Sequence, residues 1–303
     1  MFRGYVPLLL LVAAIWGASF MFIKVAVAEI DPVPMIWIRL ILAALVLVPL
    51  LFFQLGAGAA LEGLREGAWG LAFLGFANAA LPFTLIAWGE RYIDSSVAAI
   101  ANAPVPIFVA LLAIKFRPSE RVTGLRLAGI FLGFLGVGVL TGFHPEGGGW
   151  AIAGTLAVVA AAVCYAVSNI FAATRFSHVS PFVVVTGSSV TGALMLTPLA
   201  VFQLPSEMPS AKAASSVVAL GVVGTAIALL FFYRMLNRYG ASRAALVTYL
   251  IPLVAIVYGV GLLDEPVSAN VVAGLVLILG GVAVGSGAVR FARRQVVPAA
   301  PRS

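Results

Sequence analysis

The segment Val6–Ala28, VPLLLLVAAIWGASFMFIKVAVA, contains a single charged side chain, Lys24. A helix of this length rises about 1.5 Å per residue, so it can cross the roughly 30 Å hydrocarbon core of a bilayer. The segment is too long for a signal peptide, and it is followed at once by Asp31-Pro32 and a second apolar run. We therefore interpret it as a retained transmembrane helix.

Segments of this kind recur along the whole chain of 303 residues. Hydrophobic residues make up 62% of it and charged residues only 10%, whereas a typical soluble domain has about 25% charged residues. The sequence therefore predicts an all-α integral membrane protein with ten transmembrane helices. They lie near residues 6–28, 33–54, 68–89, 94–115, 122–142, 149–173, 180–203, 213–236, 241–262 and 268–289.

The positive charges indicate how these helices are oriented. A net charge of +7 would suggest a nucleic-acid partner in a soluble protein. Here most Lys and Arg residues fall in the alternate loops that share a side with the N-terminus, as the positive-inside rule requires of cytoplasmic loops. We therefore expect a lipid bilayer rather than nucleic acid as the partner. The expected location is the bacterial inner membrane, with both termini in the cytoplasm.

An internal repeat organises the predicted helices. Shifting the sequence by 149 positions places Ser19 on Ser168 and Pro32 on Pro181 without a gap. The chain then divides into two five-helix units, residues 1–145 and 146–290, followed by a basic tail, 291–303.

Because five is odd, the second unit must enter the membrane from the side opposite to the first. Inverted repeats of this kind suit carriers that expose a central site alternately to the two faces. The alternative is a duplication kept only as a stable scaffold.

Three short motifs resemble a known family. They are Trp16-Gly17-x-Ser19-Phe20, then Asp31-Pro32, then Trp37-Ile38-Arg39-Leu40. With the two-fold five-helix arrangement, they resemble the EamA family of the drug/metabolite transporter superfamily over nearly the whole chain. The resemblance implies ten helices, cytoplasmic termini and export of small metabolites. A YddG-like branch of the family exports aromatic amino acids, but no motif places this chain in that branch.

Matched residues of the first helix in each unit are candidates for substrate binding. They share one helix face, and the repeat brings an aromatic ring and a serine from each unit to the same depth. An aromatic platform with hydroxyl and amide groups suits a small amphipathic molecule. Alternatively, the rings pack against neighbouring helices and the serines bond to their own backbone. These residues are Trp16, Ser19 and Phe20, with their counterparts Tyr165, Ser168 and Asn169.

Two cations lie within the first two apolar runs. Lys24 is close to the predicted outer end, where snorkelling to the interface is the simplest interpretation. Arg39 lies deeper, where an unpartnered charge costs about 2.5 to 3.5 kcal/mol, so its side chain should face protein or water. It is expected either to serve an outer gate or a substrate carboxylate, or to pair with helix-end carbonyl groups.

Other polar and aromatic residues also fall inside apolar runs. Lipid offers no hydrogen-bond partner at these depths, so the polar groups should face the interior. Two prolines, each four residues after a polar residue, predict helix kinks. The candidate substrate-binding residues are Asn78, Trp88, Asn102, Thr248 and Tyr249, and the kinks are expected at Pro106 and Pro252. For Trp88 the alternative is an interfacial aromatic belt.

Glycine stripes mark the fifth and tenth helices. Small residues allow close helix packing, so these helices should brace the two units or form a homodimer. The stripes are Gly129, Gly133, Gly136 and Gly138 in one helix and Gly274, Gly281 and Gly285 in the other.

Several classes of function lack their sequence signatures. The chain has one cysteine, Cys164, and no nucleotide-binding or metallohydrolase motif, so we expect no cofactor, no metal site and no enzyme activity. The carboxylates lie in loops or at helix ends, so a proton relay through the membrane centre has no obvious carrier. Glu90 is the nearest candidate, but an interfacial ion pair with Arg91 explains it more simply.

The predicted function is export of small amphipathic metabolites by an alternating-access permease. Too few cations are available to bind phosphates, so a zwitterion or a weakly charged amphiphile is expected. The family resemblance implies export and favours amino acids, especially aromatic ones. Nucleosides or cationic dyes as substrates, and a channel or scramblase, remain alternatives.

Overall fold

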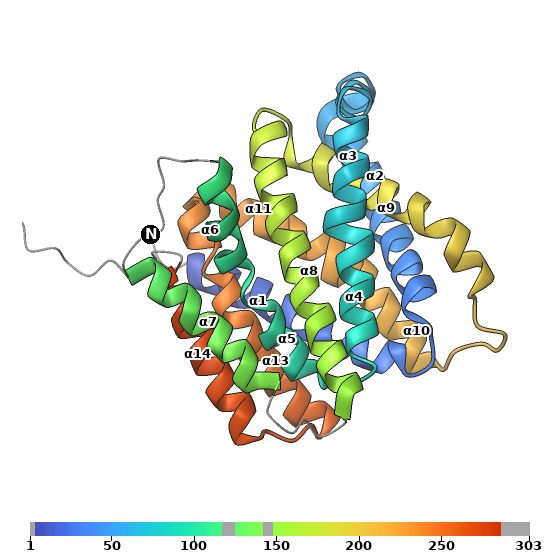
Figure 1. Cartoon of the computed structure of the whole chain (residues 1–303). Coiled ribbons are helices and arrows are strands. Elements are labelled where there is room, and N and C mark those ends of the chain that lie inside the picture. The colour runs from blue at the N-terminus through green and yellow to red at the C-terminus, as the bar shows by residue number, and fades with distance from the viewer. Residues whose placement is uncertain (1–3, 117–124, 142–147, 286–303) are drawn as a thin grey trace, which may run out of the picture.

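A computed structural model describes residues 4–116, 125–141 and 148–285, and its regular elements are all helices (Figure 1). The predicted tail 291–303 lies outside the described residues. The first half contains α1 (Tyr5–Val27), α2 (Pro32–Glu66), α3 (Ala68–Leu74), η1 (Gly75–Ala80), α4 (Leu81–Gly89), α5 (Ser95–Asn102), α6 (Val105–Phe116) and α7 (Leu125–Thr141). The second contains α8 (Gly148–Arg175), α9 (Pro181–Phe202), α10 (Ala211–Val218), η2 (Ala219–Ile227), α11 (Ala228–Tyr239), α12 (Ala241–Ala244), α13 (Val247–Leu263) and α14 (Ala269–Gly285).

Seven helical runs of the described chain are long and apolar enough to cross a bilayer. They are Tyr5–Val27, Pro32–Glu66, Ala68–Gly89, Ser95–Leu112, Gly148–Arg175, Pro181–Phe202 and Ala211–Tyr239. Three shorter apolar helices accompany them, at Leu127–Leu140, Val247–Leu263 and Ala269–Val284. The all-helical membrane class predicted from the sequence is confirmed.

The second run is longer than the predicted 33–54. Helical structure continues to Glu66, interrupted at Gly56, whose φ of 75° lies in the left-handed region that glycine adopts without strain. Helix α2 therefore extends beyond the apolar run on which the prediction was based.

The third run of each half contains a π-helix. In the first half η1 lies between α3 and α4, and in the second half η2 lies between α10 and α11. An extra residue per turn widens the helix and leaves carbonyl groups without their usual partners, and such segments are frequent at functional sites. The apolar pattern predicted plain α-helices here.

The two prolines expected to kink helices lie in different settings. The fourth run breaks after Asn102, and Pro106 occupies the first turn of α6, where its missing N–H costs nothing. Helix α13 runs through Pro252, and the interruption in that run falls earlier, between α12 and α13.

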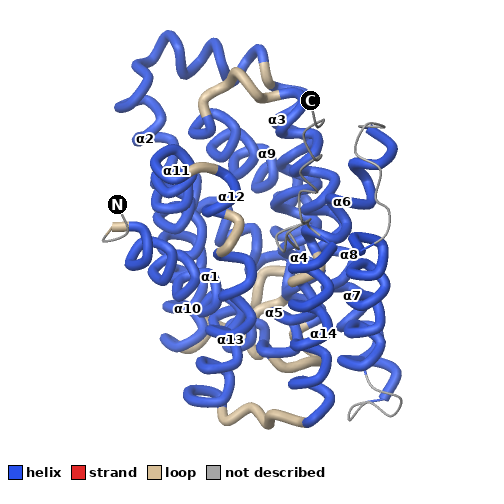
Figure 2. Tube along the Cα trace, turned by 90° about the vertical axis from the view of Figure 1, so that its left-hand side faces the viewer, coloured by secondary structure: helices blue, strands red, loops and turns tan. Residues whose placement is uncertain are grey.

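The packing of the two halves is reciprocal. Helix α1 contacts α13 of the second half, and its counterpart α8 contacts α5 and α6 of the first. The second runs, α2 and α9, pack together, and so do α7 and α14, which lie side by side in both views (Figures 1 and 2). Each half therefore buries its surface against the other.

The glycine stripes form the contact between α7 and α14. A Cβ atom at Gly281 would collide with the backbone of Gly133 and lie 2.7 Å from the oxygen of Gly129, and one at Gly136 would lie 2.8 Å from the nitrogen of Ile278. Close backbone approach here requires glycine. The two stripes thus pack within one chain, and the homodimer stays a prediction.

We expect Gly281→Ala to lower the free energy of unfolding by about 1 to 3 kcal/mol, because the added methyl group must push two helix backbones apart. Thermal denaturation of the purified protein measures this. Gly138→Ala is the matched control, since a Cβ atom there meets nothing within 4 Å. Equal melting temperatures for both variants would contradict the close contact.

Candidate functional site

A cavity of about 130 Å³ lies between the two halves. Its wall combines apolar side chains with amide and hydroxyl groups from five helical runs. The lining residues are Leu40, Leu74, Asn78, Ala79, Phe83, Ser168, Asn169, Ala172, Val184, Val185, Ser188, Ser189, Thr225, Leu229 and Tyr233. Such a mixed wall can bind a small molecule that is partly apolar and partly polar.

The two π-helices bring polar groups to this cavity. Asn78 lies in η1 and Thr225 in η2. The Thr225 hydroxyl donates to the carbonyl oxygen of Leu220, five residues back, at 2.9 Å. The widened turn of η2 therefore holds the Thr225 oxygen in place, where it can also accept a hydrogen bond.

That oxygen accepts from Arg39. The guanidinium is buried, its Nε donates to Thr225 Oγ1 at 3.0 Å, and its Cζ lies 3.9 Å from the centre of the Phe83 ring. No described carboxylate lies within ion-pair distance of Arg39. Because Thr225 and Phe83 both line the cavity, Arg39 forms a positive patch directly behind its wall.

Three serines complete the polar part of the site. Ser168 and Ser189 are buried in the cavity wall, and the Ser168 hydroxyl has no hydrogen-bond partner among the described residues. Ser188 donates to the carbonyl oxygen of Val185 at 3.1 Å. Ser19, by contrast, lies outside this wall and donates to Ile15 of its own helix at 3.1 Å. Burying a hydroxyl group without a hydrogen-bond partner costs free energy unless a ligand or a water molecule supplies that partner.

The predicted aromatic platform is split into two pairs. The ring centre of Tyr165 lies 6.3 Å from that of Phe83, which lines the cavity, whereas the ring centre of Trp16 lies 5.1 Å from that of Phe232. Trp16 and Tyr165 are 149 positions apart, and so are Phe83 and Phe232. The pairs are therefore repeat equivalents that pack against different hydrophobic clusters. The structure does not bring Trp16 and Tyr165 together.

The remaining sequence candidates lie around the cavity or away from it. Asn78, Ser168 and Asn169 line it, while Phe20 packs in the main core. The Asn102 side-chain oxygen is buried without a donor, and Thr248 donates to Ala245 O at 2.8 Å. Tyr249 packs against the main core, and Trp88 stacks edge-on with Tyr92 at 5.1 Å and lies 6.4 Å from Trp150.

Several lining residues were absent from the sequence candidates. Ser188 is the repeat counterpart of Arg39, and Ser189 and Thr225 are polar residues within apolar runs. The criterion that selected Asn78 applies equally to them. Phe83 and Tyr233 carry no such signal, because aromatic residues are common throughout membrane helices.

One end of the helix bundle, here called the Glu90 end, is where α1 and α4 end and α2 and α5 begin. There Lys24 donates to the carbonyl oxygens of Glu90 and Ile93, both at 2.8 Å. The Lys24 ammonium thus has protein partners at this end, which the snorkelling interpretation did not include. The ion pair expected between Glu90 and Arg91 is wrong, because Arg91 pairs with Asp31.

Two carboxylates join the halves at this end. Glu265, in the connection from α13 to α14, accepts from the N–H groups of Ser95 and Ser96 at 2.7 and 3.1 Å and from the Ser96 hydroxyl at 2.7 Å. The exposed Glu29 accepts from the N–H and hydroxyl of Ser210 at 2.7 and 2.6 Å. These contacts close the Glu90 end across the boundary between the halves.

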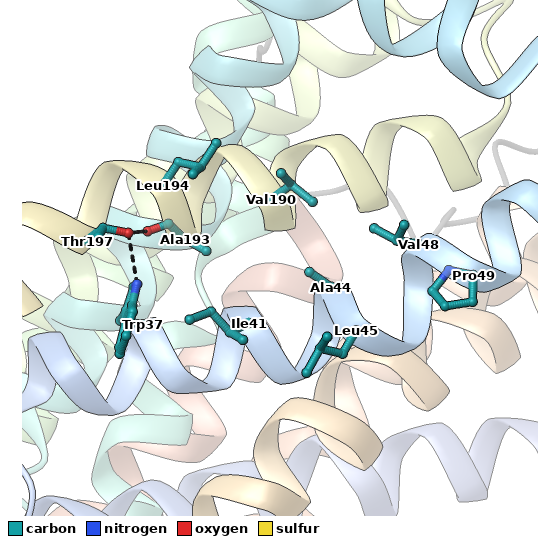
Figure 3. A pocket seen from close by; sticks show the side chains of 10 residues that line it. All are labelled: Trp37, Ile41, Ala44, Leu45, Val48, Pro49, Val190, Ala193, Leu194 and Thr197. Carbon is teal, nitrogen blue, oxygen red and sulfur yellow. Dashed lines mark hydrogen bonds between the residues drawn. The ribbon is translucent and has the colours of Figure 1, made fainter. Parts of the chain in front are cut away.

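A second, apolar groove of about 390 Å³ runs between α2 and α9 (Figure 3). Four lining pairs are exactly 149 positions apart: Ile41 and Val190, Ala44 and Ala193, Leu45 and Leu194, and Val48 and Thr197. Trp37 Nε1 donates to Thr197 Oγ1 at 3.0 Å across one end of it. Leu45 and Leu194 are each 65% exposed, so this groove opens on the outer surface of the helix bundle rather than into the cavity.

Comparisons with known proteins agree with this architecture. An uncharacterized transporter of Archaeoglobus fulgidus is 29% identical over 90% of this chain and 95% of its own. A protein of Salmonella typhimurium named "Probable amino-acid metabolite efflux pump" is 30% identical over 90% of this chain and 92% of its own. A solved crystal structure matches with a TM-score of 0.64 at 20% identity, covering 94% of this chain and 96% of that one, which shows the fold.

The model of one family matches the chain twice, at residues 4–142 and 152–286, so that each half is matched separately. These two matches cover most of the chain. The protein belongs to the EamA-like transporter family.

Proposed function

We propose that this transporter is an inner-membrane permease with ten transmembrane helices in two inverted five-helix repeats, 1–145 and 146–290, and with both termini in the cytoplasm. The reciprocal packing and the two separate family matches support the repeat. The distribution of positive charge supports the orientation and makes the Glu90 end the outer end. Alternating access then arises from movement of one repeat against the other around the cavity.

The proposed cargo is a small amphipathic metabolite with a carboxylate, in particular an amino acid, with aromatic ones favoured. The observation that carries this proposal is Arg39, a buried guanidinium that meets no described carboxylate and borders a cavity with free hydrogen-bonding capacity. A substrate carboxylate supplies the missing counter-charge, and Phe83 and Tyr165 offer aromatic faces. The name of the Salmonella relative points the same way.

The cavity volume fits this size class. At about 130 Å³ it is smaller than the roughly 300 to 1,000 Å³ of sites for drug-sized ligands. A bulky dye would require a large rearrangement, and a cationic one would meet Arg39. Nucleosides and a channel or scramblase remain the rival functions that an experiment must separate.

Counterflow in proteoliposomes tests the proposal. Vesicles preloaded with unlabelled phenylalanine should take up labelled phenylalanine with saturable kinetics. A carrier that releases an unlabelled molecule outside returns with a labelled one bound to the same site. Other amino acids should compete, whereas the corresponding amines without a carboxylate, nucleosides and cationic dyes should not. Non-saturable flux would favour a channel, and competition by dyes or nucleosides alone would overturn the amino-acid assignment.

A further inference from the structure

Glu90 is a buried carboxylate without a hydrogen-bond donor. It directly follows α4, its side chain is 0% exposed, and neither carboxylate oxygen has a hydrogen-bond partner among the described residues. An ionised carboxylate can accept several hydrogen bonds, and burying it with none is among the most costly arrangements in a protein. A protonated carboxylic acid carries no such charge penalty.

Charged groups from three elements act electrostatically on this carboxyl group. Lys24 comes from α1, Arg39 from α2 and Glu265 from the connection between α13 and α14. Helix α8 packs against the neighbouring Gly89 with the backbone of Gly154 and the side chain of Val158.

The Lys24 side chain already has hydrogen-bond partners. The Lys24 ammonium donates to the backbone oxygens of Glu90 and Ile93, and so ties α1 to the connection between α4 and α5. An ionised Glu90 side chain would compete with these two carbonyl oxygens for the Lys24 ammonium. Burial raises the pKa of Glu90 well above that of an exposed glutamate; Lys24 and Arg39 oppose this and Glu265 adds to it.

We propose that Glu90 is a proton-binding site of the transporter, which holds its proton while the Glu90 end is closed and releases it when that end opens. The released proton passes from the carboxyl oxygen to water at the opening. The ionised carboxylate then draws the Lys24 ammonium away from the two carbonyl oxygens, and α1 loses its tie to the first half's outer connection. Protonation of Glu90 therefore controls whether α1 stays bound to the connection between α4 and α5.

The sign of the pH dependence follows. The closed state raises the pKa of Glu90 above its value in the water-exposed open state. Protonation therefore stabilises the closed state fully at pH values below the open-state pKa, and this contribution is lost as the pH rises through the closed-state pKa. Acid closes the Glu90 end, and alkali favours its opening.

Infrared titration tests the protonation directly. At neutral pH the reconstituted protein should show the carbonyl-stretch band of a protonated carboxylic acid, which disappears as the pH is raised. Glu90→Gln should remove this band, and Glu29→Gln, which changes an exposed carboxylate at the same end, should retain it. A wild-type spectrum without a band that depends on Glu90 would overturn the proposal.

Cysteine labelling tests the opening. In a Cys164→Ser background, Ser95→Cys places the only thiol at a buried position of the Glu90 end. Labelling by a membrane-impermeant maleimide, normalised to the denatured protein to remove the thiol's own pH dependence, should rise with pH. Glu90→Gln should keep labelling low at every pH, whereas Asp264→Asn, which removes an exposed carboxylate at the same end, should leave the rise intact.

An unchanged rise in the Glu90→Gln protein would overturn the gating step. If that variant does not fold, Glu90→Asp is used in its place. Its labelling should still rise with pH, but at a different midpoint pH from the wild type. An unchanged midpoint pH would count against Glu90 as the titrating group. Neither measurement uses a transported substrate, so failure here and failure of the amino-acid assignment are distinguishable.

Discussion

Replacing Arg39 with glutamine is expected to abolish most carboxylate-dependent transport while leaving the protein as stable as before, or more so. A hydrogen bond to a charged group contributes about 1.5 to 3 kcal/mol, and its loss from the bound substrate corresponds to about a 10-fold to 150-fold reduction in affinity. The stability result follows because Arg39 is buried without a described counter-ion, an arrangement that costs free energy in the empty protein.

Three comparisons make this result specific. Arg39→Lys should retain part of the transport, because an ammonium keeps the charge but lacks the planar fork that binds a carboxylate with two hydrogen bonds. Arg91→Gln is the matched control, since Arg91 pairs with Asp31 at the partly exposed Glu90 end and is remote from the cavity wall. Counterflow of labelled phenylalanine and the melting temperature are measured for each. If Arg39→Gln transports normally, or melts far below the wild type, Arg39 is a structural residue.

The membrane class could be predicted from the sequence because it depends only on the length and apolarity of each run. Asn78 was found for a related reason: a polar group within an apolar run must face protein or water. Ser168 and Asn169 were found as the repeat counterparts of Ser19 and Phe20. All three line the cavity.

The pairing of side chains could not be predicted in this way. Matched positions such as Trp16 and Tyr165 were expected to converge, but the structure places each of them against the third run of the other half, on Phe232 and Phe83 respectively. Phe83 lines the described cavity and Phe232 does not. The charge at Arg39 likewise has no equivalent in the second half, where Ser188 stands.

The role of the loop carboxylates was also beyond sequence reasoning. Glu90 and Glu265 both lie outside the apolar runs, and position alone indicated exposed groups. The chain turns back sharply at both places and buries them between the halves. Glu265 in particular is the basis of a large expected effect on stability.

Removal of the Glu265 side chain should destabilise the protein more than any other single change at the Glu90 end. Its carboxylate caps the N-terminus of α5 and accepts three hydrogen bonds from Ser95 and Ser96. The helix dipole strengthens these bonds, and burial leaves water unable to replace them. With donors left unsatisfied at about 1 to 3 kcal/mol each, we expect Glu265→Ala to lower the free energy of unfolding by about 3 kcal/mol or more.

The backbone shows why this position is so specific. Asp264 ends α13 in the left-handed region, with φ of 55°, and the N–H of Glu265 donates to Gly259 O at 3.0 Å. A Cβ atom at Gly259 would collide with the Glu265 carboxylate, so glycine is needed for the carboxylate to reach α5. Gly259→Ala should therefore reproduce part of the loss by displacing the carboxylate rather than deleting it.

The matched control for this prediction is Asp264→Asn, which removes the neighbouring exposed carboxylate while asparagine tolerates the left-handed backbone. Its free energy of unfolding should lie within about 0.5 kcal/mol of the wild-type value, as is usual for surface substitutions. Glu265→Gln should lie between the control and Glu265→Ala, because an amide retains one acceptor oxygen for the three donors. Thermal denaturation of the four variants in detergent ranks them, and a Glu265→Ala protein as stable as Asp264→Asn would show that α5 is held to the second half by other contacts.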